Sequence, residues 1–408
     1  MKKLIIFIFL IQYAGNLVAS VGDVVDIRSY FKSFSLLYSF KDNLLPDDSP
    51  EGPYIVQQNV FRVSLISDPA EWITIEGAYS LAPTTNQVPG GSASLFAPSV
   101  DKYRLYDFDD NIIERGQFYL GHNIDRLNFT INTQVADIIL GRQVVSFGSA
   151  RFFNPTDIFS PFSFQELNKE EKTGVDAVRV RVPLGSMSEL DMGYVFGKEA
   201  DWKKSAAFLR GVFPVLDYDV SVMAIQYRTH LMAGLNVSGS IKGAGVWLEG
   251  AYTFDSMLDK WDKDGDFFRI STGFDYYFAN DVYLFFEYHY SSAGTLSSSK
   301  YLTNVMSNRA AYGDSGVYLL GEHYVAPGMN WQLHPLVGLN LQLLINCADP
   351  SVMSIAAMKF SLSDNINLDA GATLSFGKKP QKGDVVPELH SEFGTYPHFF
   401  YINLSAYF

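Results

Sequence analysis

The side chains best suited to acid–base chemistry are Glu287 and His289, which stand two positions apart. In a β-strand both would lie on one face, where a carboxylate beside an imidazole can move a proton. Such a pair is more often simply part of a polar surface. The sequence has no G-x-S-x-G nucleophile turn, no H-E-x-x-H metal site and no glycine-rich phosphate loop. We therefore predict that the protein is not an enzyme.

The composition argues against several other classes of function. The single cysteine, Cys347, provides neither a disulfide framework nor a zinc or iron–sulfur ligand set, so we predict no metal and no cofactor. The net charge of −13 argues against nucleic acid as a partner, because phosphate binding requires a basic surface.

Apolar and polar residues alternate with a period of two through most of the chain. In the last segment, 398–408, one face carries Phe400, Ile402, Leu404, Ala406 and Phe408, and the other carries Phe399, Tyr401, Asn403, Ser405 and Tyr407. Segments 267–278 and 365–376 repeat this pattern. Strands of about ten residues with one apolar face are typical of membrane barrels, in which that face meets lipid.

The links between these segments are of two kinds. Short links alternate with long ones near 41–56, 81–124, 143–171, 291–313 and 377–397. Outer-membrane barrels show this alternation and an even strand number, whereas soluble sandwiches and propellers do not. We count about 18 candidate strands, including 314–325 and 332–345, and 16 is also compatible with the pattern. The predicted fold class is an all-β, transmembrane antiparallel β-barrel.

The chain begins Met1-Lys2-Lys3, followed by a short apolar run and then the small residues Val18, Ala19 and Ser20. This order is typical of a cleavable signal peptide, and the apolar run is too short to span a bilayer. We predict a signal peptide over 1–20 and a single barrel domain over 21–408, in the outer membrane of a Gram-negative-type bacterium.

Charged side chains on the polar face of the strands are partly sorted by sign. Basic residues dominate the first half of the chain and acidic residues the second: Arg62, Arg126, Arg179, Arg181 and Arg210, then Glu249, Asp275, Glu287 and Asp369. Glu76, Asp191, Arg269 and Lys359 break the sorting. In a closed barrel the two halves face each other, so a basic wall would oppose an acidic wall and select solutes by charge. Alternatively, these charges hydrate a wide pore or pair with one another.

The most distinctive stretch runs from Gly141-Arg142-Gln143 through a Phe147-Gly148 turn to Asn154-Pro155-Thr156-Asp157-Ile158-Phe159-Ser160-Pro161. It resembles a largely uncharacterised group of outer-membrane porins that is similar to the 18-stranded alginate-export channels. The loop is too apolar to lie in solvent, so we expect it to fold against the inner wall and carry Arg142 and Arg151 to the narrowest part. The alternative is a loop packed on the outer rim.

We predict an outer-membrane channel, or porin, for small polar or charged solutes. Two alternatives stay open: a transporter of hydrophobic molecules, because Phe267, Phe285, Phe399 and Tyr401 also face inward, and a barrel-anchored adhesin or structural protein. Expected partners are outer-membrane lipids and the barrel assembly machinery, which we expect to recognise the chain end at Tyr407 and Phe408.

Overall fold

The structure is a computed structural model that describes residues 25–40, 52–89, 103–160, 168, 170–257, 265–381 and 388–408. The predicted signal peptide lies outside these residues. Nearly all regular structure in the described part is strand, interrupted by one α-helix, α2 (Tyr301–Ser307), and a few single turns of other helix types. The prediction of an all-β chain is therefore confirmed.

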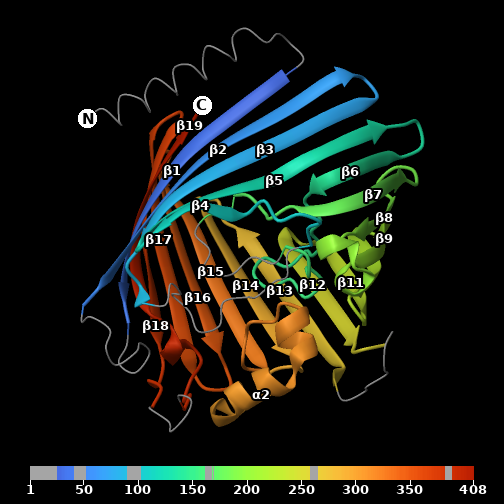
Figure 1. Ribbon diagram of the computed structural model, residues 1–408. Helices are drawn as coiled ribbons and strands as arrows, with labels where there is room; N and C mark the ends of the chain where they lie inside the picture. The colour runs from blue at the N-terminus through green and yellow to red at the C-terminus, as the bar shows by residue number, and fades with distance from the viewer. Residues whose placement is uncertain are drawn as a thin grey trace, which may run out of the picture.

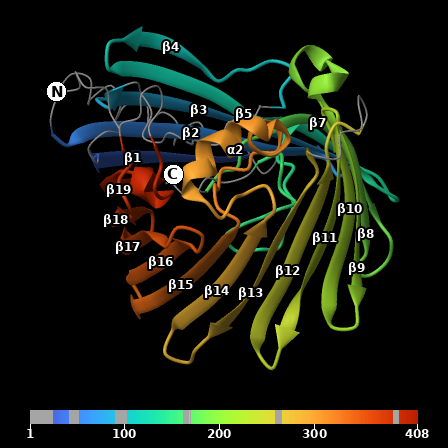
Figure 2. The same cartoon turned by 90° about the horizontal axis from the view of Figure 1, so that it is seen from below.

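Antiparallel strands form one sheet that closes on itself (Figures 1 and 2). The strands are β1 (Val25–Ser39), β2 (Tyr54–Ala70), β3 (Ile73–Asn86), β4 (Asp110–Arg115), β5 (Phe118–Asn132), β6 (Asp137–Gln143), β7 (Val175–Pro183), β8 (Glu189–Val195), β9 (Ala206–Val215), β10 (Tyr218–Tyr227), β11 (His230–Ile241), β12 (Ala244–Phe254), β13 (Phe267–Tyr277), β14 (Val282–Ser291), β15 (His323–His334), β16 (Val337–Asn346), β17 (Ser351–Ser363), β18 (Ile366–Phe376) and β19 (His398–Tyr407). The ring closes where β1 pairs with both β2 and β19. Strand β4 pairs only with β5 among the described strands, so the barrel itself has 18 strands, as predicted.

The strand boundaries differ from the prediction in several places. The predicted long link 81–124 contains the end of β3, all of β4 and the start of β5, and the predicted strand 332–345 covers the end of β15, a turn and most of β16. The candidate strand 314–325 is not a strand up to residue 322, because β15 begins at His323. Residues 317–320 instead fold into the barrel, where Val317, Leu319 and Leu320 are buried. Their apolar character reflects packing inside the barrel, which a period-two pattern cannot distinguish from contact with lipid.

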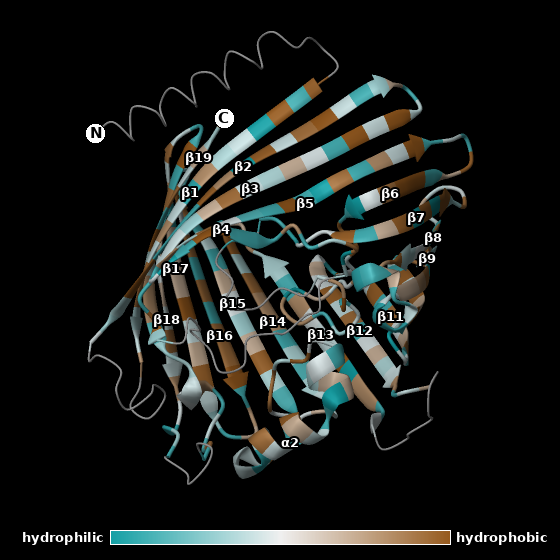
Figure 3. Ribbon diagram, viewed as in Figure 1, coloured by the Kyte–Doolittle hydropathy of each residue, from teal (hydrophilic) through white to brown (hydrophobic). Residues whose placement is uncertain are grey.

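The two faces of each strand meet different surroundings, as the alternating bands in Figure 3 show. On β19, Phe400 and Ile402 are half exposed on the outside, whereas Asn403 and Ser405 are buried inside. Exposed apolar side chains recur around the outside of the ring, which is the surface expected in contact with lipid. No described helix combines the length and apolar character that a membrane crossing requires.

The interior holds the largest apolar clusters, and loops supply much of them. Phe147, Ile158 and Phe159 from the segment after β6 pack with Phe208 of β9 and Ile225 of β10. A second cluster joins Phe153 of the same segment to Leu319, Tyr324, Phe393 and Tyr396. Inward-folded chain therefore occupies part of the lumen.

Candidate solute channel

Residues 144–160, the inner loop, leave the end of β6 and cross into the lumen. The phenyl ring of Phe147 packs edge-on against two other rings. The distance between ring centroids is 5.2 Å to Phe208 and 6.2 Å to Phe159. Gly148 has φ +115°, and a Cβ there would lie 2.4 Å from Oδ1 of Asn154, so the turn requires glycine. The structure thus shows the inward position of this segment rather than the rim position.

The carboxylate of Glu249 on β12 holds one part of the inner loop. The backbone N–H groups of Ser149, Ala150 and Thr156 donate to it at 2.9, 3.1 and 2.8 Å, and the Thr156 hydroxyl donates at 2.8 Å. The side chain of Glu249 is completely buried. Four hydrogen bonds to one buried carboxyl group fix the loop on this wall, because leaving these N–H groups without an acceptor would cost free energy.

Glu287 on β14 holds the next part in the same way. Its carboxylate accepts from the N–H groups of Arg151 at 2.8 Å and Phe153 at 2.7 Å, and more loosely from that of Phe152 at 3.2 Å. The indole Nε1 of Trp247 donates to it at 2.9 Å, and Glu287 is also completely buried. Both predicted channel-lining glutamates therefore point inward but lie beneath the loop. Their carboxylates meet backbone amides and not the open lumen.

Arg151 is the inner-loop cation that stays accessible. Its side chain is 56% exposed and pairs with Asp275 on β13, with Nη2 3.0 Å from the carboxylate. The Tyr283 hydroxyl donates to the same carboxylate at 2.7 Å, and the guanidinium lies 5.5 Å from the Trp247 ring centroid. Arg151 thus lies inside the barrel, and its predicted place at the narrowest part stays a prediction.

Arg62 of β2 and Arg126 of β5 lie beside the later part of the connection between β6 and β7, at Glu171. Arg62 contacts Asp125 and Glu171, each at 3.0 Å. Arg126 lies 3.2 Å from Asp125 and 3.5 Å from Glu171. Both arginines are buried, so carboxylates from β5 and from the chain before β7 neutralise this part of the predicted basic wall.

The remaining predicted arginines divide between ion pairs and packing. Arg142 binds Asp176 at 2.7 Å and also donates to two backbone carbonyls, which ties the end of β6 to its neighbours. Arg179 pairs with Asp191 at 2.7 Å and Arg181 with Glu189 at 2.8 Å. Asp191, an exception to the predicted sorting, is thus the direct partner of an inward arginine.

The two remaining candidates, Arg210 and His289, do not form a reactive site. The guanidinium of Arg210 lies 5.5 Å from the Phe147 ring centroid, so it supports the inner loop. His289 bonds the Ser271 hydroxyl at 2.9 Å and packs against Phe153 at 4.7 Å, and no hydrogen bond joins it to Glu287 in the described chain. The described residues also contain no group of His, Cys, Asp and Glu that could hold a metal ion.

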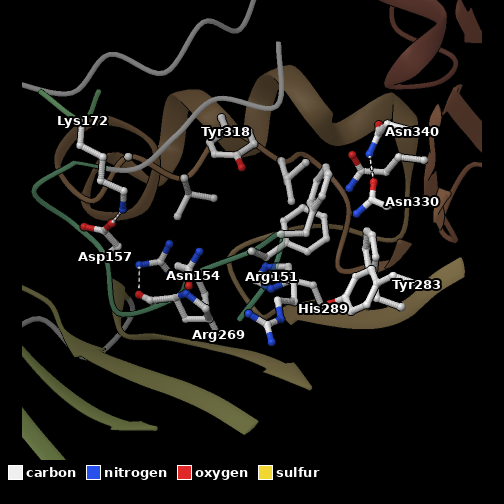
Figure 4. Close-up of a pocket in the computed structure, with 18 residues that line it drawn as sticks. Arg151, Asn154, Asp157, Lys172, Arg269, Tyr283, His289, Tyr318, Asn330 and Asn340 are labelled. Carbon is white, nitrogen blue, oxygen red and sulfur yellow. Dashed lines mark hydrogen bonds and ion pairs between the residues drawn. The ribbon is translucent and has the colours of Figure 1, made fainter. Parts of the chain in front are cut away.

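Open space remains along the wall formed by β14 to β19. An upper cavity of about 370 Å³ lies between the inner loop and residues 316–319 (Figure 4). A lower cavity of about 530 Å³ follows it and reaches Lys359, Asp369 and Tyr401. The two cavities share Tyr283, Asn330, Asn340 and Gln342, which form their junction. Ligand pockets commonly have volumes of about 300–1,000 Å³, so either cavity can hold a small solute.

Sequence reasoning missed the amides at this junction. Asn340 and Gln342 alternate with Leu339, Leu341 and Leu343 on β16, so their inward position was readable from the period-two pattern. Which inward side chains the loops would cover is a tertiary property that the alternation does not contain.

No family model matches the chain, and no curated protein matches it in sequence. Solved structures do match in shape. The outer-membrane protein OpdK of Pseudomonas aeruginosa has a TM-score of 0.55 at 8% identity, covering 94% of this chain and 99% of its own. OccK2 (OpdF) of Pseudomonas aeruginosa has a TM-score of 0.59 at 10% identity, covering 94% of this chain and 97% of its own. A BenF-like porin of Pseudomonas fluorescens Pf-5 has a TM-score of 0.56 at 8% identity, covering 94% of this chain and 98% of its own. At such low identity these likenesses establish the fold, which is that of outer-membrane porins.

Proposed function

We propose that this protein is a channel in the outer membrane of a Gram-negative bacterium, through which small polar or charged solutes pass. The observation that carries the proposal is the pair of adjoining cavities inside a closed barrel whose outer surface is apolar. The apolar outer surface requires lipid around the barrel, and the polar lining of the cavities provides a path for polar solutes.

Among such solutes, we propose small organic anions. The upper cavity is lined by Arg151, Lys172 and Arg269 against one carboxylate, Asp157, which Lys172 binds at 2.6 Å. Arg269 donates to the Pro155 carbonyl at 2.7 Å and has no carboxylate within ion-pair distance in the described chain. Glu249 and Asp157 act on this buried cation only at longer range, and a buried cation that forms no ion pair favours an anion beside it. Structures of OccK2 and OpdK contain glucuronate and vanillate, which are both carboxylates.

The test is electrical. Purified protein inserted into a planar bilayer should give discrete conductance steps, and a potassium chloride gradient should give a reversal potential on the anion-selective side. A protein that inserts without conductance steps would contradict the channel. Steps with cation preference would contradict only the choice of anions.

The alternatives have less support. Phe267 is buried in an apolar cluster away from both cavities. Phe285 borders the upper cavity, and Phe399 and Tyr401 border the lower one beside polar side chains such as Asn403. Catalysis is not proposed, because Glu287 is occupied by backbone amides. The finer kinship with alginate-export channels rests on the resemblance of residues 141–161 alone and stays a prediction.

The chain end supports one proposal about assembly. Phe408 exchanges backbone hydrogen bonds with Ser29 at 2.8 and 3.0 Å, and its ring is half exposed. Burial of one such ring contributes only about 1.5–3 kcal/mol, too little to determine the stability of the barrel. Deleting Phe408 should lower the amount in the outer membrane of cells much more than the stability after refolding in detergent. Equal losses in both assays would identify an ordinary packing residue.

A further inference from the structure

The junction of the two cavities is a row of neutral side chains on three neighbouring strands. Tyr283 of β14 is the cross-strand partner of Asn330 of β15, and Asn330 is the partner of Asn340 of β16. Gln342 stands two positions from Asn340 on the same inward face. Because all four line both cavities, a solute moving from the upper to the lower cavity passes them. None of the four carries a charge.

These side chains keep hydrogen-bonding capacity that the described protein does not use. The Asn340 amide donates to Oδ1 of Asn330, a contact visible in Figure 4, and the Tyr283 hydroxyl donates to Asp275. Within the described chain the Gln342 amide has no partner. An amide offers two donors and an acceptor, and a phenol that donates can still accept. The junction therefore presents donors and acceptors side by side.

This mixed lining suits one chemical group better than others. A hydroxyl donates and accepts at once, so several hydroxyls on one solute can replace the water at the junction. A hydrocarbon surface of the same size would displace that water and return no hydrogen bond, which costs free energy for each polar group left unmatched. The charges of the upper cavity, Arg151, Lys172 and Arg269, do not make this distinction.

We propose that Tyr283, Asn330, Asn340 and Gln342 are specificity-determining residues that favour polyhydroxylated organic anions over unsubstituted anions of the same charge. The inference rests on the proposed channel function and adds to it a separation of tasks. The upper cavity selects for negative charge, and the junction selects for hydroxyl groups.

The test compares two anions with one carbon skeleton. Quinate is cyclohexanecarboxylate with four added hydroxyl groups, so both have a six-membered ring and a single carboxylate. Reversal potentials measured with each anion against chloride, across a bilayer containing the protein, give their permeability ratio. Wild type should prefer quinate by about 2- to 10-fold, the effect of one or a few net hydrogen bonds.

Variants locate the preference. Gln342→Leu and Asn340→Leu should each bring the ratio toward one, whereas Gln342→Asn should keep most of it. The control is Asn367→Leu, which makes the same amide-to-leucine change on β18 at a position that lines neither cavity. This variant should keep the wild-type ratio.

The outcomes separate the two proposals. Equal permeability of the two anions in wild type, or an unchanged ratio in both leucine variants, overturns the junction proposal and leaves a channel without this selectivity. An equal loss in the Asn367→Leu control also overturns it. A wild-type protein that carries no ions overturns the proposed function itself. If one leucine variant does not insert, the wild-type ratio and the second variant still decide.

Discussion

Two stretches of the inner wall carry polar side chains, but only one of them meets the open lumen. On β12 and β14, Glu249 and Glu287 are covered by the inner loop and accept its backbone amides. On β15 and β16, Asn330, Asn340 and Gln342 remain along the two cavities. These two buried carboxyl groups thus hold the protein's own loop, whereas the amides of β15 and β16 are left in contact with the solute.

The difference has a physical cause. An irregular loop inside a barrel brings N–H groups that need acceptors, and a carboxylate is the strongest acceptor that a side chain offers. A neutral amide is cheaper to leave in contact with water or solute. Inward charge in a barrel sequence therefore indicates where a loop is anchored at least as much as where a solute passes.

The largest expected effect comes from breaking the covered stretch. Glu287→Gln replaces a carboxylate that accepts from Arg151, Phe153 and Trp247 with an amide that has one acceptor and two donors. Leaving buried amides without acceptors costs about 2–5 kcal/mol. The inner loop should leave the wall, and single-channel conductance should rise with frequent switching between levels.

The matched control is Asp369→Asn, the same carboxylate-to-amide change in the lower cavity, where Asp369 contacts Asn403 and not the inner loop. It should leave the conductance steps stable. If Glu287→Gln gives the same steady conductance as wild type, the loop does not depend on this anchor.

The second effect concerns charge selectivity and separates accessible from covered arginines. Arg151→Gln should lower the anion preference by about twofold, the effect of one charge several ångströms away across water. Arg179→Gln should change it less, because both arginines are ion-paired but the Arg179 side chain is only 14% exposed, against 56% for Arg151. Reversal potentials in a potassium chloride gradient measure both. A larger shift for Arg179→Gln would place the selecting region beside β7 rather than beside the inner loop.

The sequence predicted the barrel well and the site only in part. Alternation is a local property imposed by lipid outside and water inside, so β19 and β18 were found nearly to the residue. The inward positions of Glu249, Glu287 and Arg151 were also predicted. Whether each of these side chains is covered or accessible depends on the path of residues 144–160 across the lumen. That path brings together groups far apart in the sequence, such as Thr156 and Glu249, which are 93 positions apart. No local pattern encodes that path.

A smaller effect should follow pH through the outer loops. Glu392 is buried where three connections meet, with its carboxylate near Tyr324, Asn346 and the Leu320 N–H. Burial, reinforced by the nearby Asp349 carboxylate, raises the pKa of Glu392 from 4.5 to about 8. The folded state then holds a proton that the unfolded state has released, so the stability from this group is complete below pH 4.5 and is lost as pH rises through about 8.

Protease cleavage of the outer loops should therefore accelerate between pH 6 and 9, and Glu392→Gln should remove most of that dependence. Neutralising this group should not alter the quinate preference, because Glu392 lines neither cavity. A variant that keeps the full wild-type pH dependence would assign it to another group.

The smallest expected effect concerns the later part of the connection between β6 and β7, which lies beside β1. There the contacts are between side chains: Lys32 of β1 binds Glu170 and donates to Asn168 at 2.8 Å. In Lys32→Met the buried charge is removed, and the 43% exposed Glu170 side chain can rehydrate, so the cost should be about 1 kcal/mol or less. Conductance should change much less than in Glu287→Gln, and 1 M salt should make wild type and variant more alike, because salt screens the exposed Glu170 side of this ion pair. A conductance change in Lys32→Met that exceeds the change in Glu287→Gln would reverse the comparison. It would mean that the ion pairs on the basic side, rather than the buried carboxylates, hold the loop across the lumen.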